Sequence, residues 1–144
     1  MFERFRLELN RHKQRPFLEA VAAACALVAT ADGEVSFSER ARLDTVIESL
    51  SQLRLFDPHE VVDAFDEHVA QLADDEDGVA AMLKVIRAGT RADGAADLLL
   101  RISAVMSLAD GRDSADEHAV MLRICAALAL PQTAVDDAIA SVQV

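Results

Sequence analysis

The stretch AVAAACALVATADGEVSFSE, from Ala20 to Glu39, decides the fold of this chain. Its first half is almost entirely Ala, Val, Leu and Cys, which favours a buried helix, and an Asp-Gly pair ends that helix. A Ser-x-x-Glu tetrapeptide then begins the next helix. The same order returns in SAVMSLADGRDSADE, from Ser103 to Glu117. The sequence therefore predicts two copies of one helical unit, packed about a pseudo-twofold axis.

The composition of the 144 residues supports this interpretation, because 52% are hydrophobic and only 4% are aromatic. A chain of this kind favours an all-α fold over a sheet. The 3.6-residue period predicts a compact bundle of about seven or eight short helices. We divide the chain into a basic amphipathic segment at 1–16 and a helical domain at 17–144, with repeat halves at about 17–73 and 95–142.

Three helices are predicted with definite limits. Pro16 suits the first turn of a helix that continues to the Asp-Gly pair. Asp57, followed by Pro58 and by Glu60 at the third helical position, is a strong start signal. The segment 95–109 is apolar nearly all round, so we expect it to be the most buried helix and to pair with its equivalent at 17–31.

The net charge of −11 argues against nucleic acid as a partner and favours cations or basic surfaces. The sequence holds no phosphate-binding loop, dinucleotide fingerprint or nucleophile elbow, and its four histidines lack zinc spacing. Cys25 and Cys125 lie among apolar residues, which indicates packing thiols. We therefore expect no enzymatic activity. With no signal peptide and no apolar run long enough to span a membrane, the expected location is cytoplasmic.

The repeated acidic motif has two interpretations that the residues leave open. In the first, Glu39 and Glu117 close capping boxes at helix starts, while Asp32 and Asp110 are turn residues beside glycines with positive φ. In the second, the four carboxylates hold a metal ion. All-oxygen ligands favour a hard cation such as Ca²⁺, Mg²⁺ or Mn²⁺. Both roles can coexist only if each glutamate uses different oxygens.

The spacing in each copy matches only the second half of a calcium-binding EF-hand loop. The earlier ligand places hold Val28 and Thr30 in the first copy and Met106 and Leu108 in the second. Neither loop is therefore a complete calcium cage, and a metal would need carboxylates from both copies or several waters.

Three segments carry a resemblance to a known family: RHKQRPFLEAVAAACALVATADGEVSFSE, LRLFDPHEVVDAF and ISAVMSLADGRDSADE. Over residues 11 to 142 the chain resembles the TerB-like family of bacterial tellurite-resistance proteins. The resemblance implies a helical protein with internal twofold symmetry and a cytoplasmic role beside the membrane in a metal-stress complex. It also implies an integral membrane partner, TerC, and metal ligation by the four repeated acids. The pair Arg112-Asp113 departs from the family pattern.

The segment at 1–16 has a net charge of +3, so the rest of the chain carries −14. Phe2, Phe5 and Leu9 lie on one helical face, which predicts a basic amphipathic helix that touches anionic lipid or packs on the acidic body. We expect a non-enzymatic cation-binding protein with a membrane partner. The alternative is a metal-free helical scaffold in which the acids only cap helices. An enzyme that reduces tellurite is least favoured, because only two thiols are present.

Overall fold

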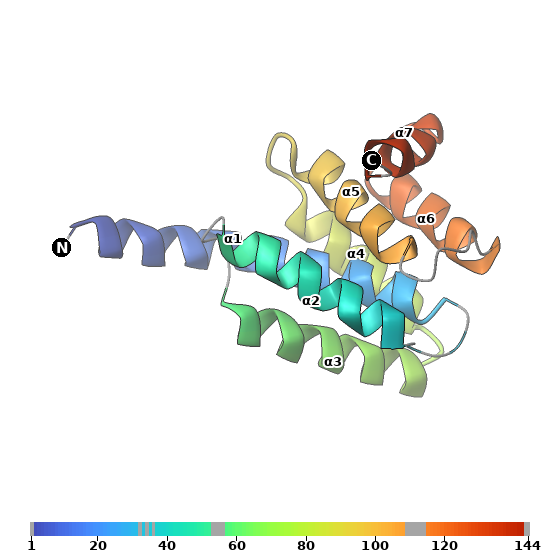
Figure 1. Ribbon diagram of the computed structural model, residues 1–144, viewed down its shortest axis with the longest axis horizontal. Coiled ribbons are helices and arrows are strands. Elements are labelled where there is room, and N and C mark those ends of the chain that lie inside the picture. Colours follow the sequence, from blue (N-terminus) through green and yellow to red (C-terminus); the bar gives the residue numbers. More distant parts are fainter. Residues whose placement is uncertain are drawn as a thin grey trace.

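The structure is a computed structural model that describes residues 2–31, 33, 35, 37–52, 57–108 and 115–142, with side chains from Arg15 onward apart from those of residues 49–52. These residues form seven helices and no strand (Figure 1), which confirms the all-α prediction. The helices are α1 (Phe2–Ala29), α2 (Phe37–Gln52), α3 (Pro58–Asp74), α4 (Gly78–Gly89), α5 (Ala95–Ser107), α6 (Ala115–Ala127) and α7 (Thr133–Val142).

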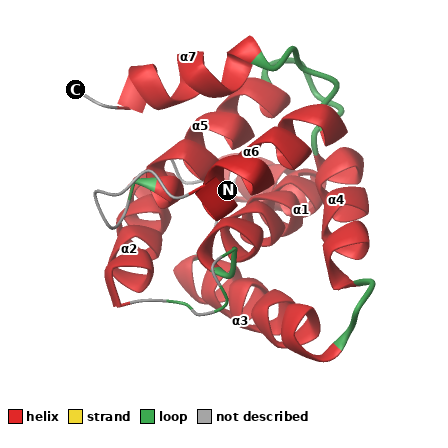
Figure 2. Cartoon of the chain, turned by 90° about the vertical axis from the view of Figure 1, so that its right-hand side faces the viewer, coloured by secondary structure: helices red, strands yellow, loops and turns green. Residues whose placement is uncertain are grey.

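Helix α1 is the centre of the bundle. From Leu18 to Ala29 every side chain except that of Glu19 is buried, and α3, α4, α5 and α6 all contact this helix (Figure 2). The expectation that the helix at 95–109 is the most buried was wrong, although α5 does contact α1 as predicted. Alanine explains the difference, since its small side chain lets several helices approach one axis closely.

The start of α1 also differs from the prediction. The helix begins at Phe2 and passes through Pro16, and its N-terminal half projects from the body of the protein (Figure 1). A proline inside a helix removes one backbone hydrogen bond and disfavours the helical conformation of the residue before it, so local rules place it at a start. The structure departs from this local rule at a point of close packing, where the Pro16 backbone lies directly against Gly89 of α4.

Other helix limits agree with the local signals. The Asp57 side chain caps α3 by accepting a hydrogen bond from the His59 amide at 2.9 Å, with Pro58 in the first helical position. Gly33 follows α1 with φ of +101°, the left-handed conformation predicted for it. Helices α1 and α5 end, and α2 and α6 begin, at the same offset that separates Glu39 from Glu117. The predicted twofold axis itself stays a prediction.

Candidate functional site

The two repeated glutamates occupy equivalent positions in the fold. Glu39 is the third residue of α2 and Glu117 is the third residue of α6. This is the position that a capping box requires. The partner serines of the two predicted boxes, Ser36 and Ser114, lie outside the described residues.

Both glutamates are buried, which the capping interpretation did not predict. Glu39 is 1% exposed and Glu117 is 5% exposed, although acidic side chains at helix starts usually face water. A carboxylate removed from water needs compensation by hydrogen bonds, a positive charge or a cation. Both residues interact with other groups of the chain. Each copy of the repeat thus places one acidic group inside the protein.

The remaining predicted ligands, Asp32 and Asp110, fall outside the described residues, as does the Arg112-Asp113 pair. Helix α5 contacts both α2 and α6, the helices that carry the buried glutamates. Among the described side chains, no three His, Cys, Asp or Glu residues gather closely enough to hold a metal ion. Carboxylate oxygens such as those of the two described glutamates suit a hard cation in chemistry.

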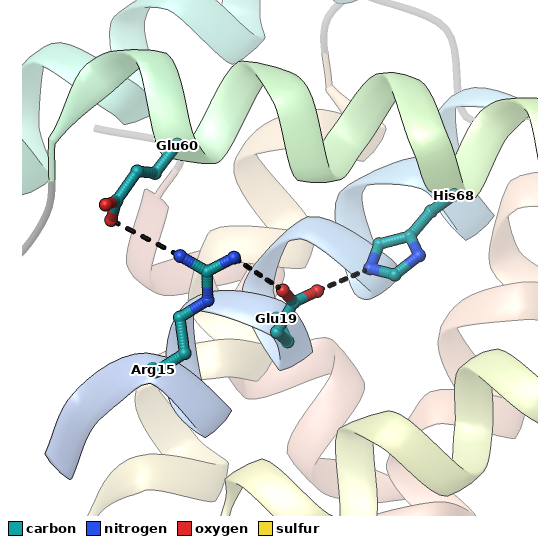
Figure 3. Close-up of polar contacts among 4 residues, drawn as sticks. All are labelled: Arg15, Glu19, Glu60 and His68. Carbon is teal, nitrogen blue, oxygen red and sulfur yellow. Dashed lines mark hydrogen bonds and ion pairs between the residues drawn. The ribbon is translucent and has the colours of Figure 1, made fainter. Parts of the chain in front are cut away.

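A second polar cluster joins α1 to α3 (Figure 3). The Glu19 carboxylate lies 3.3 Å from Arg15 Nη2 through Oε1 and 3.1 Å from His68 Nε2 through Oε2. Arg15 also reaches Glu60 of α3, with 3.6 Å between Nη1 and Oε2. His68 is buried, whereas Arg15 and Glu60 are half exposed.

The sequence indicates only one of the contacts in this cluster. Arg15 and Glu19 are four residues apart, which places them together on a helix. The contact between Glu19 and His68 spans 49 residues, and no local pattern indicates it. The cluster fastens α1 to α3 beside the point where the N-terminal half of α1 leaves the body.

The two thiols are inert packing groups, as predicted. Cys25 is fully buried, and this desolvation raises the pKa of its thiol to about 12. Desolvation also raises the pKa of Cys125, whose Sγ lies 3.1 Å from the Pro131 carbonyl oxygen. A thiolate is the reactive form of cysteine, so neither side chain suits redox chemistry.

Among the described side chains, one large apolar group departs from the general burial. Phe37 begins α2, two residues before buried Glu39, and is 89% exposed. An exposed aromatic ring of this size is a common contact point for a partner.

The sequence of the chain is similar to those of known tellurite resistance proteins. A family model described as tellurite resistance protein TerB matches residues 18–140. A tellurium resistance protein TerB from Alcaligenes sp is 31% identical over 96 residues, which make up 66% of this chain and 79% of that relative. No solved structure matches the chain. None of the described helices is long and apolar enough to cross a membrane.

Proposed function

Because the chain belongs to the TerB family of tellurite resistance proteins, we propose that it is a non-enzymatic stress-resistance protein that binds a hard divalent cation. Its ligands are the repeated acids Asp32, Glu39, Asp110 and Glu117, and the cation is Ca²⁺, Mg²⁺ or Mn²⁺. The observation that carries the metal proposal is the burial of both repeated glutamates at equivalent helix positions.

A buried carboxylate needs charge compensation. A capping glutamate needs only to reach one backbone amide at the helix end, and that interaction leaves the rest of the carboxylate in water. Glu39 and Glu117 are instead buried, where an ionised carboxylate is costly unless positive charge or several donors face it. A bound cation supplies that charge and prefers carboxylate oxygen, so the donor chemistry fits the proposed ion.

We also propose that the protein works at the inner face of the membrane with a TerC-like integral membrane partner. The support is the projection of the N-terminal half of α1 from the body, combined with the net charge of +3 at residues 1–16. A basic helix that extends from an acidic protein can reach anionic lipid headgroups or a membrane protein beside them.

A metal-free interaction scaffold is the second candidate. The exposed ring of Phe37, beside the buried Glu39, favours it. In this case, the two glutamates only complete the helix starts, and the partner binds the surface around the first turn of α2.

Calorimetric titration of the chelator-treated full chain with Ca²⁺, Mg²⁺, Mn²⁺ and Zn²⁺ separates the two candidates. We expect heat and a rise in melting temperature with at least one of the first three ions, because binding to the folded state alone stabilises it. Glu39→Gln and Glu117→Gln should remove most of that rise, since a neutral amide is a poor ligand for a hard cation.

The matched control is Asp116→Asn, which removes an exposed acid next to Glu117 in the same helical turn. It should bind the ion as the parent does. Without metal, the two glutamine variants should melt within a few degrees of the parent, because glutamine still fills the third capping position and a cap is worth about 1 kcal/mol. A parent protein that gains no stability from any ion at millimolar concentration establishes the scaffold instead.

A further inference from the structure

A groove of about 550 Å³ opens where α1 enters the body, between the end of α4 and the start of α5. The loop between α4 and α5 lies at the end of the body from which the N-terminal half of α1 projects (Figure 1). The volume falls within the range of roughly 300 to 1,000 Å³ that is usual for small-molecule sites. Neither of the two described repeated acids, Glu39 and Glu117, lines this groove.

The floor of the groove is apolar. Phe17, Ala95 and Leu98 line it and are each partly buried. Gly89 brings the α4 backbone against α1, because a Cβ at this position would overlap the Pro16 carbonyl oxygen and approach the Ala20 Cβ to 2.6 Å. The close crossing of the two helices fixes the wall of the groove in place.

Two arginines stand at the rim. Arg91 and Arg101 are exposed and line the groove, and neither forms an ion pair with any described residue. Of the described residues that line the groove, Asp93 is the one acid. Arg101 also borders a smaller hollow with Asp97 and Asp137. Two guanidinium groups thus keep their donors available on a protein of net charge −11.

We propose that this groove binds a small amphipathic organic anion. Arg91 and Arg101 hold its carboxylate or phosphate group, because guanidinium groups bind such oxygens through paired, charge-assisted hydrogen bonds. Phe17 and Leu98 contact its apolar part, and removal of that part from water favours binding. The proposed anion contacts use none of the four residues proposed to hold the cation.

The test uses the full chain and four probes: octanoate, octyl phosphate, octanol and acetate. Octanol lacks the charge and acetate lacks the chain, so each removes one of the two proposed interactions. We expect one of the octyl anions to bind about tenfold or more tightly than both octanol and acetate, a difference equal to about 1.4 kcal/mol. Comparison of octanoate with octyl phosphate identifies the preferred anionic group.

The double variant Arg91→Gln/Arg101→Gln should weaken binding of the preferred anion by about tenfold and leave octanol binding unchanged. Arg123→Gln is the matched control, since Arg123 is an exposed arginine on α6 outside the groove. It should bind like the parent, and melting curves should confirm that all variants fold. Leu98→Asn should weaken the octyl anions but not acetate.

Three outcomes overturn the proposal. The first is equal binding of the octyl anions and octanol, and the second is an unchanged affinity in the double arginine variant. The third is no binding of either octyl anion, which excludes a small-molecule site even if an acidic peptide binds the groove. The double arginine variant should respond to added cations as the parent does. Failure of the anion proposal can therefore be distinguished from failure of the metal proposal.

Discussion

Glu19 Oε2 lies 3.1 Å from His68 Nε2 and joins the central helix α1 to α3 across 49 residues of sequence. His68 is 8% exposed and Glu19 is partly buried, so this contact is more sheltered from water than the half-exposed contact of Arg15 with Glu60. Sheltered polar contacts contribute more to stability than exposed ion pairs, because their partners cannot turn to water when the contact is lost.

Glu19→Ala should therefore lower the free energy of unfolding by about 1 to 3 kcal/mol, since it leaves a buried histidine without its carboxylate. Glu60→Ala removes an exposed ion pair and should cost less than about 1 kcal/mol. Urea denaturation of both variants measures the difference. Equal losses in the two variants would show that burial of His68 adds nothing to the contact.

Gly89→Ala tests the crossing of α1 and α4. Alanine normally favours a helix over glycine by about 1 kcal/mol. Here the new methyl group would overlap the Pro16 carbonyl oxygen, which is backbone and cannot turn aside. We expect a net loss of about 1 to 3 kcal/mol in the free energy of unfolding.

Gly78→Ala is the control for that loss, because a Cβ there would lie 3.1 Å or more from its neighbours. It should cost less than Gly89→Ala in the same denaturation experiment. A stabilised Gly89→Ala variant would contradict the close packing of α1 on α4.

Burial of Cys25 predicts how stability depends on pH. The pKa of its thiol is about 12 in the folded protein, against 9.0 for an unperturbed thiol. The unfolded chain therefore loses this proton first, and the folded state loses stability as the pH rises from about 9 towards 12. The slope from this one group is at most about 1.4 kcal/mol per pH unit.

Comparison with Cys25→Ala isolates this effect, because the variant lacks the titrating group and should lose less stability over the same pH range. At pH 8 a thiol reagent should label Cys25 only after the parent has been unfolded by denaturant. Rapid labelling of the folded protein at that position would be inconsistent with a buried thiol.

Deletion of residues 1–14 tests the proposed membrane contact. We expect the deletion to reduce sedimentation with anionic vesicles and to abolish the salt dependence of binding, because the basic residues of this segment supply the electrostatic attraction. Neutral vesicles serve as the control. If the shortened protein binds anionic vesicles as well as the full chain does, the segment has no part in membrane contact.

Local chemistry was enough to predict most helix limits. The cap at Asp57, the positive φ of Gly33 and the helical position of Glu39 and Glu117 each depend on a few neighbouring residues. A 3.6-residue period and a capping pattern are properties of a short stretch of chain, so the sequence by itself determined them and the all-α class.

Local sequence patterns could not show which helix lies at the centre of the bundle. Apolar character alone favoured the segment at 95–109 as the most buried helix. In the structure, α3, α4, α5 and α6 pack against α1, because its alanines permit close approach. Pro16 likewise lies inside α1 and not at its start, at the point where α1 packs against Gly89 of α4.

The burial of Glu39 and Glu117 and the contact of Glu19 with His68 were also decided by tertiary structure. A side chain is buried by helices that come from elsewhere in the chain. A short sequence pattern does not show which helices these are. The sequence therefore determined where the repeated acids stand along their helices, while packing of the whole bundle decided that the two glutamates lie inside it.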